Sequence, residues 1–199
     1  MKYFKMLTLP IIIIIGIILY NLPIFSSWRY FNYGVTAFNE QKYESAAQSF
    51  KKVFDHYDDH ILHFNYTISK YSESYNKIKA IRKSGIAPDD SIQAKKINDL
   101  ANESFEVIEN TLNIHMTGMK PNEIGDLYVA KGNLYLLINK IDNAKICFEK
   151  AIEYDDDQKQ ALTRLVEMES AHDSSFVSKL LLSTNESYPI ELNTKWNPF

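Results

Sequence analysis

Apolar and small residues recur along this chain at intervals of three and four positions, the spacing typical of amphipathic helices. Two stretches share the same order of such positions, and a short polar turn interrupts each of them. The first carries Gly34, Ala46 and Phe50, and the second carries Gly132, Tyr135, Ala144, Phe148 and Ala151. In both, an alanine follows the glycine by twelve positions and a phenylalanine follows that alanine by four. The pattern predicts an all-α fold with similar helix pairs over residues 27–60 and 122–157.

The repeated glycines indicate a close approach between the two helices of each pair. A glycine inside a helix costs about 1 kcal/mol relative to alanine, so the same glycine in both stretches calls for a packing reason. We expect Gly34 and Gly132 to lie on the first helices, with Ala46 and Ala144 facing them from the second helices. A larger side chain at either glycine would push the helices apart, which typically costs about 1–3 kcal/mol.

This order of small and aromatic residues resembles the tetratricopeptide repeat, which spans about 34 residues. The resemblance covers residues 27–60 and 122–157, and it departs from the family pattern at Ala37 and Lys131. It implies stacked helix pairs that hold other proteins, with no catalysis of their own. It also implies a fold of about three pairs, since about three are needed to bury a continuous core.

The rest of the soluble part carries weaker helical patterns. Residues 61–121 read as a diverged helix pair, in which Phe64, Ile68 and Tyr71 share one face. Residues 158–171 read as a capping helix that shields the last pair. Residues 172–199 form a mixed tail that ends in aromatic residues, and we expect that tail either to be tucked onto the domain or to be offered to a partner.

The amino end is predicted to be a transmembrane helix. Residues 6–25 carry no charge and are long enough to cross the hydrocarbon layer of a bilayer. Lys2 and Lys5 precede them, so the positive-inside rule leaves residues 1–5 in the cytoplasm and sends the repeat domain across. The alternative is a cleaved signal peptide, although no Ala-x-Ala site follows. The abundance of Ile, Asn, Lys and Tyr is typical of an AT-rich, bacterial genome. Together with the anchor and its orientation, this composition predicts a single-pass inner-membrane protein with a periplasmic domain.

Charge and composition argue against several functions. A net charge of −3 does not favour nucleic-acid binding, which needs a basic face. The sequence has no Gly-rich phosphate loop and no catalytic nucleophile motif, so we expect neither an enzyme nor a cofactor. His56, His60 and His63 could share a metal ion, as in an enzyme subunit, but they fall in a predicted turn where polar residues are expected. We therefore predict no metal site, and His115 stands apart from this cluster.

The resemblance also implies where a partner would bind. The inner face of such repeats is lined by first-helix positions, which here are Trp28, Phe31, Val35 and Phe38 in the first repeat and Asp126, Val129, Asn133 and Leu136 in the last. Only Asn133 matches the Lys and Asn pair with which the family's best-known site clamps a terminal carboxylate. An apolar or aromatic groove for an amphipathic helix or an extended segment is the better expectation. Alternatively, Trp28 and Phe31 pack at the exit of the anchor or at the bilayer surface.

These features predict a membrane-anchored scaffold or adaptor that assembles an envelope complex from other, mainly membrane or envelope, proteins. The layout of anchor and repeats is similar to the MxaK and BatC types of repeat protein, which are associated with MoxR ATPases and von Willebrand A-domain proteins. The alternative function is a periplasmic holdase or secretion accessory that binds unfolded clients.

Overall fold

A computed structural model describes residues 14–16, 18, 22–54, 56–84, 91–170 and 190–198. All regular elements among these residues are helices, so the predicted all-α class is confirmed for the described part of the chain. The helices are α2 (Pro23–Asn39), α3 (Tyr43–Phe54), α4 (His60–Lys83), α5 (Ser91–His115), the short 3-10 helix η1 (Met116–Gly118), α6 (Pro121–Leu137), α7 (Ile141–Tyr154) and α8 (Lys159–Ser170).

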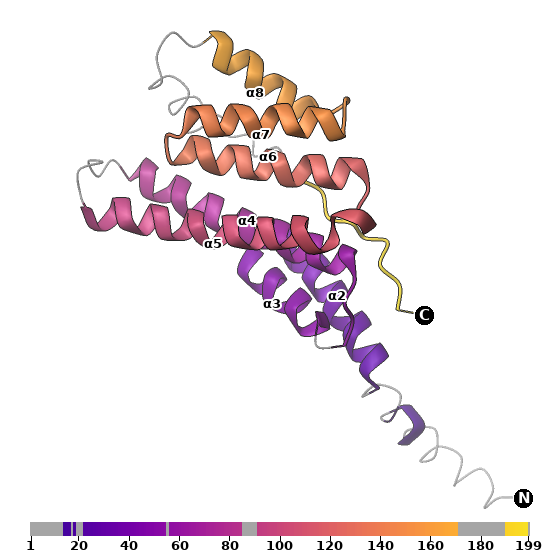
Figure 1. The fold of residues 1–199 in the computed structure, drawn as a ribbon. Coiled ribbons are helices and arrows are strands. Elements are labelled where there is room, and N and C mark those ends of the chain that lie inside the picture. The colour runs from indigo at the N-terminus through magenta and orange to yellow at the C-terminus, as the bar shows by residue number, and fades with distance from the viewer. Residues whose placement is uncertain are drawn as a thin grey trace, which may run out of the picture.

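The helices follow one another as a stack of antiparallel pairs. Each helix packs mainly on its neighbours in sequence, and α6 also packs on α4 and α5. Figure 1 shows α2 and α3 at one end of the stack and α8 at the other. This nearest-neighbour arrangement is that of a tetratricopeptide-like solenoid.

The two predicted pairs share their packing in detail. A Cβ atom on Gly34 would lie 2.7 Å from Cε1 of Phe50, and one on Gly132 would lie 2.6 Å from Cε1 of Phe148. Both rings are fully buried, as are Ala46 and Ala144. Glycine is therefore needed at both positions because the ring of the second helix lies directly against the first helix.

The turns within these pairs are also alike. Gln41 and Asn139 have left-handed φ angles of 60° and 64°, and each stands two positions before the second helix. In each turn the next backbone N–H donates back into the preceding helix: Lys42 to the carbonyl of Ala37 at 2.8 Å and Lys140 to that of Tyr135 at 2.9 Å. These are the hydrogen bonds of a Schellman helix ending, which reverses the chain tightly.

The middle pair is formed by the longest helices, α4 with 24 residues and α5 with 25. Their contact includes a buried hydrogen bond of 2.7 Å between the hydroxyl groups of Thr67 and Thr111. The start of α4 and the end of α5 lie at the same end of the pair, because the two helices run antiparallel (Figure 1). Residues 61–121, predicted as a diverged pair, contain most of α4 and all of α5.

Among the described residues, no helix combines the length and the apolar character needed to cross a bilayer. The predicted anchor, residues 6–25, lies mainly outside the described residues, and its last positions belong to α2. The membrane anchor therefore stays a prediction. Residues 172–189 of the predicted tail also lie outside the described residues, as does Phe199.

Candidate peptide-binding groove

The inner-face residues predicted to bind a partner are mostly covered by the chain itself. Val129, Asn133 and Leu136 of α6 are buried, and so is Phe31 of α2. Val35 and Phe38 are partly buried, whereas Trp28 is 49% exposed. Their contact with a partner stays a prediction.

Part of this cover is the carboxyl-terminal segment, residues 190–198, which has no regular secondary structure. Figure 1 shows it in yellow, running from beside α6 past α4 towards the α2 end of the stack. Its apolar side chains are buried near both ends: Ile190 joins the core around α4 and α6, and Trp196 joins the core around α2 and α3.

Trp196 lies in an aromatic pocket. Its ring centroid is 5.0 Å from that of Phe31 and 5.4 Å from that of Tyr57, and Phe31 in turn meets Phe50 edge to face at 5.7 Å. The tryptophan is only 7% exposed. A buried aromatic of this size removes 150–250 Å² from water, roughly speaking, and is the kind of side chain that dominates a binding interface.

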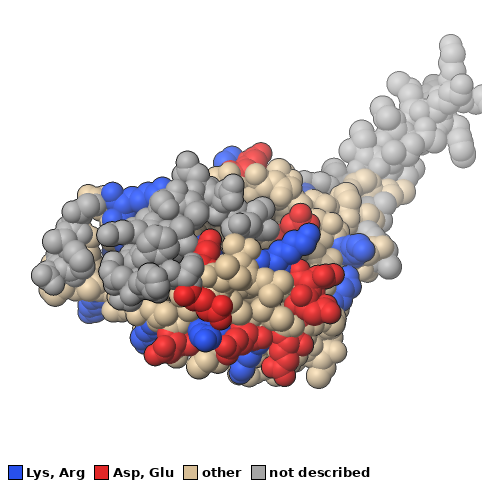
Figure 2. Space-filling model, turned by 90° about the horizontal axis from the view of Figure 1, so that it is seen from above, with Lys and Arg blue, Asp and Glu red and all other residues tan. Residues whose placement is uncertain are grey.

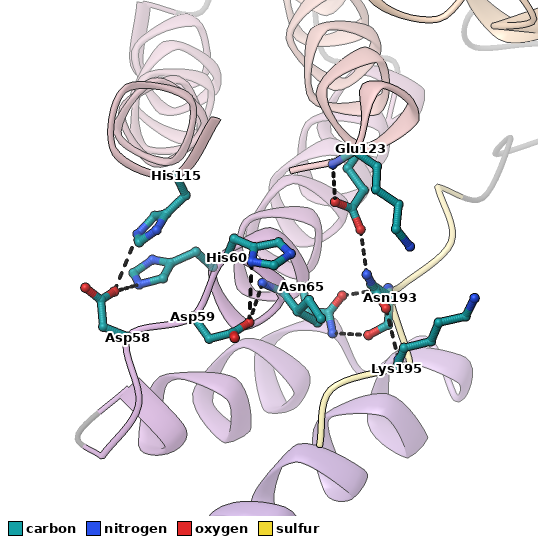
Figure 3. Close-up of polar contacts among 11 residues, drawn as sticks. Asp58, Asp59, His60, Asn65, His115, Glu123, Asn193 and Lys195 are labelled. Carbon is teal, nitrogen blue, oxygen red and sulfur yellow. Dashed lines mark hydrogen bonds and ion pairs between the residues drawn. The ribbon is translucent and has the colours of Figure 1, made fainter. Parts of the chain in front are cut away.

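Asn193 forms the polar centre of the segment. The side-chain amide of Asn65 on α4 donates to the Asn193 carbonyl at 2.8 Å and accepts from the Asn193 N–H at 2.8 Å. The Asn193 side chain donates to Glu123 on α6, as Figure 3 shows. Glu123 is itself fixed by accepting from the backbone N–H of Lys120 at 2.9 Å, which caps the start of α6. Asn65 thus binds the segment as a neighbouring strand would, through both backbone groups of one residue.

Asn133, the one position that matches the family's carboxylate clamp, forms its hydrogen bond inside the helical core. Its side-chain amide donates to the Tyr71 hydroxyl at 3.2 Å, inside the core between α4 and α6. Asn133 Oδ1 is buried without a hydrogen-bond partner among the described residues. Sequence reasoning missed Asn65, although its place among the apolar positions of α4 was a signal, because a buried asparagine requires a specific partner.

A hollow of about 630 Å³ lies between the segment and the start of α6, next to the turn before α8. Asp126 lines it and accepts a hydrogen bond of 2.9 Å from Gln158. Burial raises the pKa of Asp126 to about 7, and the nearby carboxylates of Asp155, Glu123 and Glu191 add to the rise. The carboxyl group therefore titrates near neutral pH. One of the carboxylates that raise its pKa, Glu191, belongs to the carboxyl-terminal segment.

The histidines do not group as the predicted turn cluster suggests. His56 is exposed, and His60 Nδ1 faces Asp59 Oδ1 at 3.9 Å. Instead, His63 of α4 and His115 of α5 stack with ring centroids 3.8 Å apart, beside Asp58. The signal for this grouping was the position of His115 at the end of α5, which an antiparallel pair places beside the start of α4.

In Figure 2, acidic and basic side chains are interspersed over the visible face of the described residues. The single cysteine, Cys147, is buried in α7, and burial raises the pKa of its thiol to about 11. A thiol of this kind is unreactive at neutral pH.

Comparison with known proteins supports the repeat. Residues 125–158, which cover most of α6 and all of α7, match the family model of the tetratricopeptide repeat. No curated protein and no solved structure matches the chain. The predicted resemblance is confirmed for this repeat, and tetratricopeptide repeats generally mediate protein–protein interactions.

Proposed function

We propose that this chain is a non-catalytic scaffold that binds an extended segment of another protein in the groove that residues 190–198 occupy. The groove is lined by Phe31, Tyr57, Asn65 and Glu123. One observation carries the proposal: the groove holds an extended polypeptide through both backbone groups of one residue and through a buried tryptophan. Peptide sites commonly combine main-chain hydrogen bonds, which supply affinity, with side-chain pockets, which supply specificity. The repeat at residues 125–158 supports the same class of function.

The carboxyl-terminal segment acts in this proposal as a resident ligand that competes with the partner. Because it belongs to the same chain, its effective concentration at the groove is on the order of millimolar, and a partner must displace it. A partner's apparent affinity then falls in proportion to the fraction of molecules in which the groove is free. Weakening the segment should therefore strengthen partner binding.

We place the scaffold at the bacterial inner membrane, with residues 6–25 as its anchor and the repeats in the periplasm. The support for this placement is the uncharged stretch at residues 6–25 and the lysines before it. Its partners would be membrane or envelope proteins. The layout shared with the MxaK and BatC types is in keeping with assembly of such a complex.

A fluorescent peptide with the sequence of residues 190–199 tests the groove. Its binding to the full-length chain in mild detergent would be followed by fluorescence anisotropy. We expect Trp196→Ala to bind it about tenfold or more tightly than the unaltered chain, since a buried tryptophan is typically a dominant contact. Adding Asn65→Ala should remove the gain, while Ile146→Ala, at an exposed site on α7, should behave as the unaltered chain. Equal binding to all variants would contradict the proposal.

A pull-down from membranes would then separate the scaffold from a holdase. The bait would be the Trp196→Ala chain, and the control would be the same chain with Asn65→Ala. A small set of stoichiometric membrane partners that depends on Asn65 supports the scaffold. A broad mixture of unrelated exported proteins, equal with both baits, would favour a holdase.

A further inference from the structure

Asp58, His63 and His115 bring three metal-binding side chains together at one end of the α4 and α5 pair. Asp58 stands in the connection between α3 and α4, His63 lies in the first turn of α4, and His115 ends α5. The three come from separate elements, so their meeting is a product of the fold.

The geometry of the three ligand atoms suits a single ion. Oδ1 of Asp58 lies 2.9 Å from Nε2 of His63 and 3.6 Å from Nε2 of His115, and all three atoms lie within 4.8 Å of one another. In a four-coordinate zinc site with bonds of about 2.0–2.2 Å, ligand atoms are separated by about 3.3 Å. The two distances from Asp58 lie on either side of that value, and binding requires the stacked rings to turn so that both nitrogens point at the same ion.

The ring of His63 packs between two other rings. His63 stacks on Phe54 with centroids 4.3 Å apart on one side and on His115 with centroids 3.8 Å apart on the other. Figure 3 shows Asp58 facing His115 across the gap between the connection and the end of α5. Asp59 caps α4 by accepting from the backbone N–H of Ile61 at 2.8 Å, which fixes the chain beside Asp58.

The three side chains satisfy one another only in part. Without an ion, a proton on His63 Nε2 satisfies Asp58, but the 3.6 Å distance to His115 is too long for a hydrogen bond. One cation would bind all three atoms at once.

We propose that Asp58, His63 and His115 bind a divalent first-row transition-metal ion such as Zn²⁺, with water as the fourth ligand. Imidazole and carboxylate ligands favour such ions, and two histidines with one carboxylate leave an open position. The ion would join the connection before α4 to the end of α5. This inference goes beyond protein binding and rests on none of the groove residues.

The test is isothermal titration of the full-length chain with ZnCl₂, in mild detergent and with a purification tag that contains no histidine. We expect a single ion per chain in the unaltered protein. Asp58→Asn and His115→Asn should each weaken binding about tenfold or more. Asp58 is the key variant because its side chain is 80% exposed, so its replacement leaves the fold intact. Far-UV circular dichroism checks that both variants fold.

The matched controls are His56→Asn and His60→Asn, in the same turn but outside the three ligands. Both should bind Zn²⁺ as the unaltered chain does. Zn²⁺ should also raise the melting temperature of the unaltered chain and of the controls, but not that of Asp58→Asn. The proposal is overturned if no binding is seen, if His115→Asn binds normally, or if His56→Asn abolishes binding.

Discussion

Phe148 lies so close to Gly132 that a Cβ atom on the glycine would meet the ring at 2.6 Å. Phe50 makes the same contact with Gly34, so this contact is a shared feature of both helix pairs. The ring is fully buried and cannot turn outward without leaving a cavity. At the scale of single residues, the spacing of glycine and phenylalanine in the sequence thus has a direct steric cause.

Gly132→Ala should therefore destabilise the chain by about 1–3 kcal/mol through overpacking. In an ordinary helix the same change stabilises by about 1 kcal/mol, so the sign itself is informative. Urea unfolding followed by circular dichroism measures the effect. Adding Phe148→Leu should cost less in the Gly132→Ala background than alone, because the smaller side chain relieves the contact. Strictly additive effects would show that the two residues do not meet.

Asp126 gives the chain a pH-dependent stability. Its pKa is about 7 in the folded chain against an ordinary 3.8, so between these values the folded state holds a proton that the unfolded state has released. The free energy of unfolding must then fall as the pH rises from about 4 to about 7. Asp126→Asn removes this loss of stability, because asparagine does not ionise. Its side-chain oxygen can still accept the hydrogen bond from Gln158.

We expect Asp126→Asn to be more stable than the unaltered chain at pH 8, on the order of 2 kcal/mol, and about equal to it at pH 4.5. Urea melts at both pH values measure this difference. Asp156→Asn, at an exposed site before α8, is the control and should show little change at either pH. A gain in the Asp126 variant that is the same at both pH values would rule out titration as its cause.

At the scale of elements, the sequence predicts the helix pairs better than their connections. The positions of Gly132, Ala144 and Phe148 predict α6 and α7 because each reports a close contact within one pair. The spacing of apolar residues predicts helices over 61–84 and 88–113, close to the bounds of α4 and α5, but it does not predict that His63 and His115 stack on one another. The position of residues 190–198 depends on a hydrogen bond that Asn65 donates to Asn193 and on one that Asn193 donates to Glu123. No spacing in a short extended segment indicates such partners.

The pair of α4 and α5 offers a test at this scale. The hydroxyl groups of Thr67 and Thr111 are buried and bond to each other at 2.7 Å. Thr67→Val should cost about 1–3 kcal/mol, because it leaves the Thr111 hydroxyl without its partner. Replacing both threonines by valine should restore most of the stability, since neither hydroxyl then needs a partner. Chemical denaturation of the two single variants and the double variant gives the coupling free energy between the two threonines. If the double variant loses as much stability as the two single variants together, the hydroxyl groups are not coupled.

At the scale of the whole molecule, residues 190–198 contact three helices of the stack. Trp196 contacts α2, Asn193 bonds to Asn65 on α4, and the same asparagine bonds to Glu123 on α6. Yet the segment is short and has no regular secondary structure. Weakly held parts of a fold commonly open separately from the core, at lower free energy.

We therefore expect the segment to detach before the helices unfold. In a Trp28→Phe chain, Trp196 is the only tryptophan, and its burial should give a blue-shifted emission. With increasing urea the emission should shift to the red at a lower concentration than the loss of helical circular dichroism. Asn65→Ala should move the first transition to still lower urea and leave the second nearly unchanged, because only the first breaks the bonds to Asn193. Coincident transitions would mean that the segment is part of the folded core, and a partner could then not displace it without unfolding the stack.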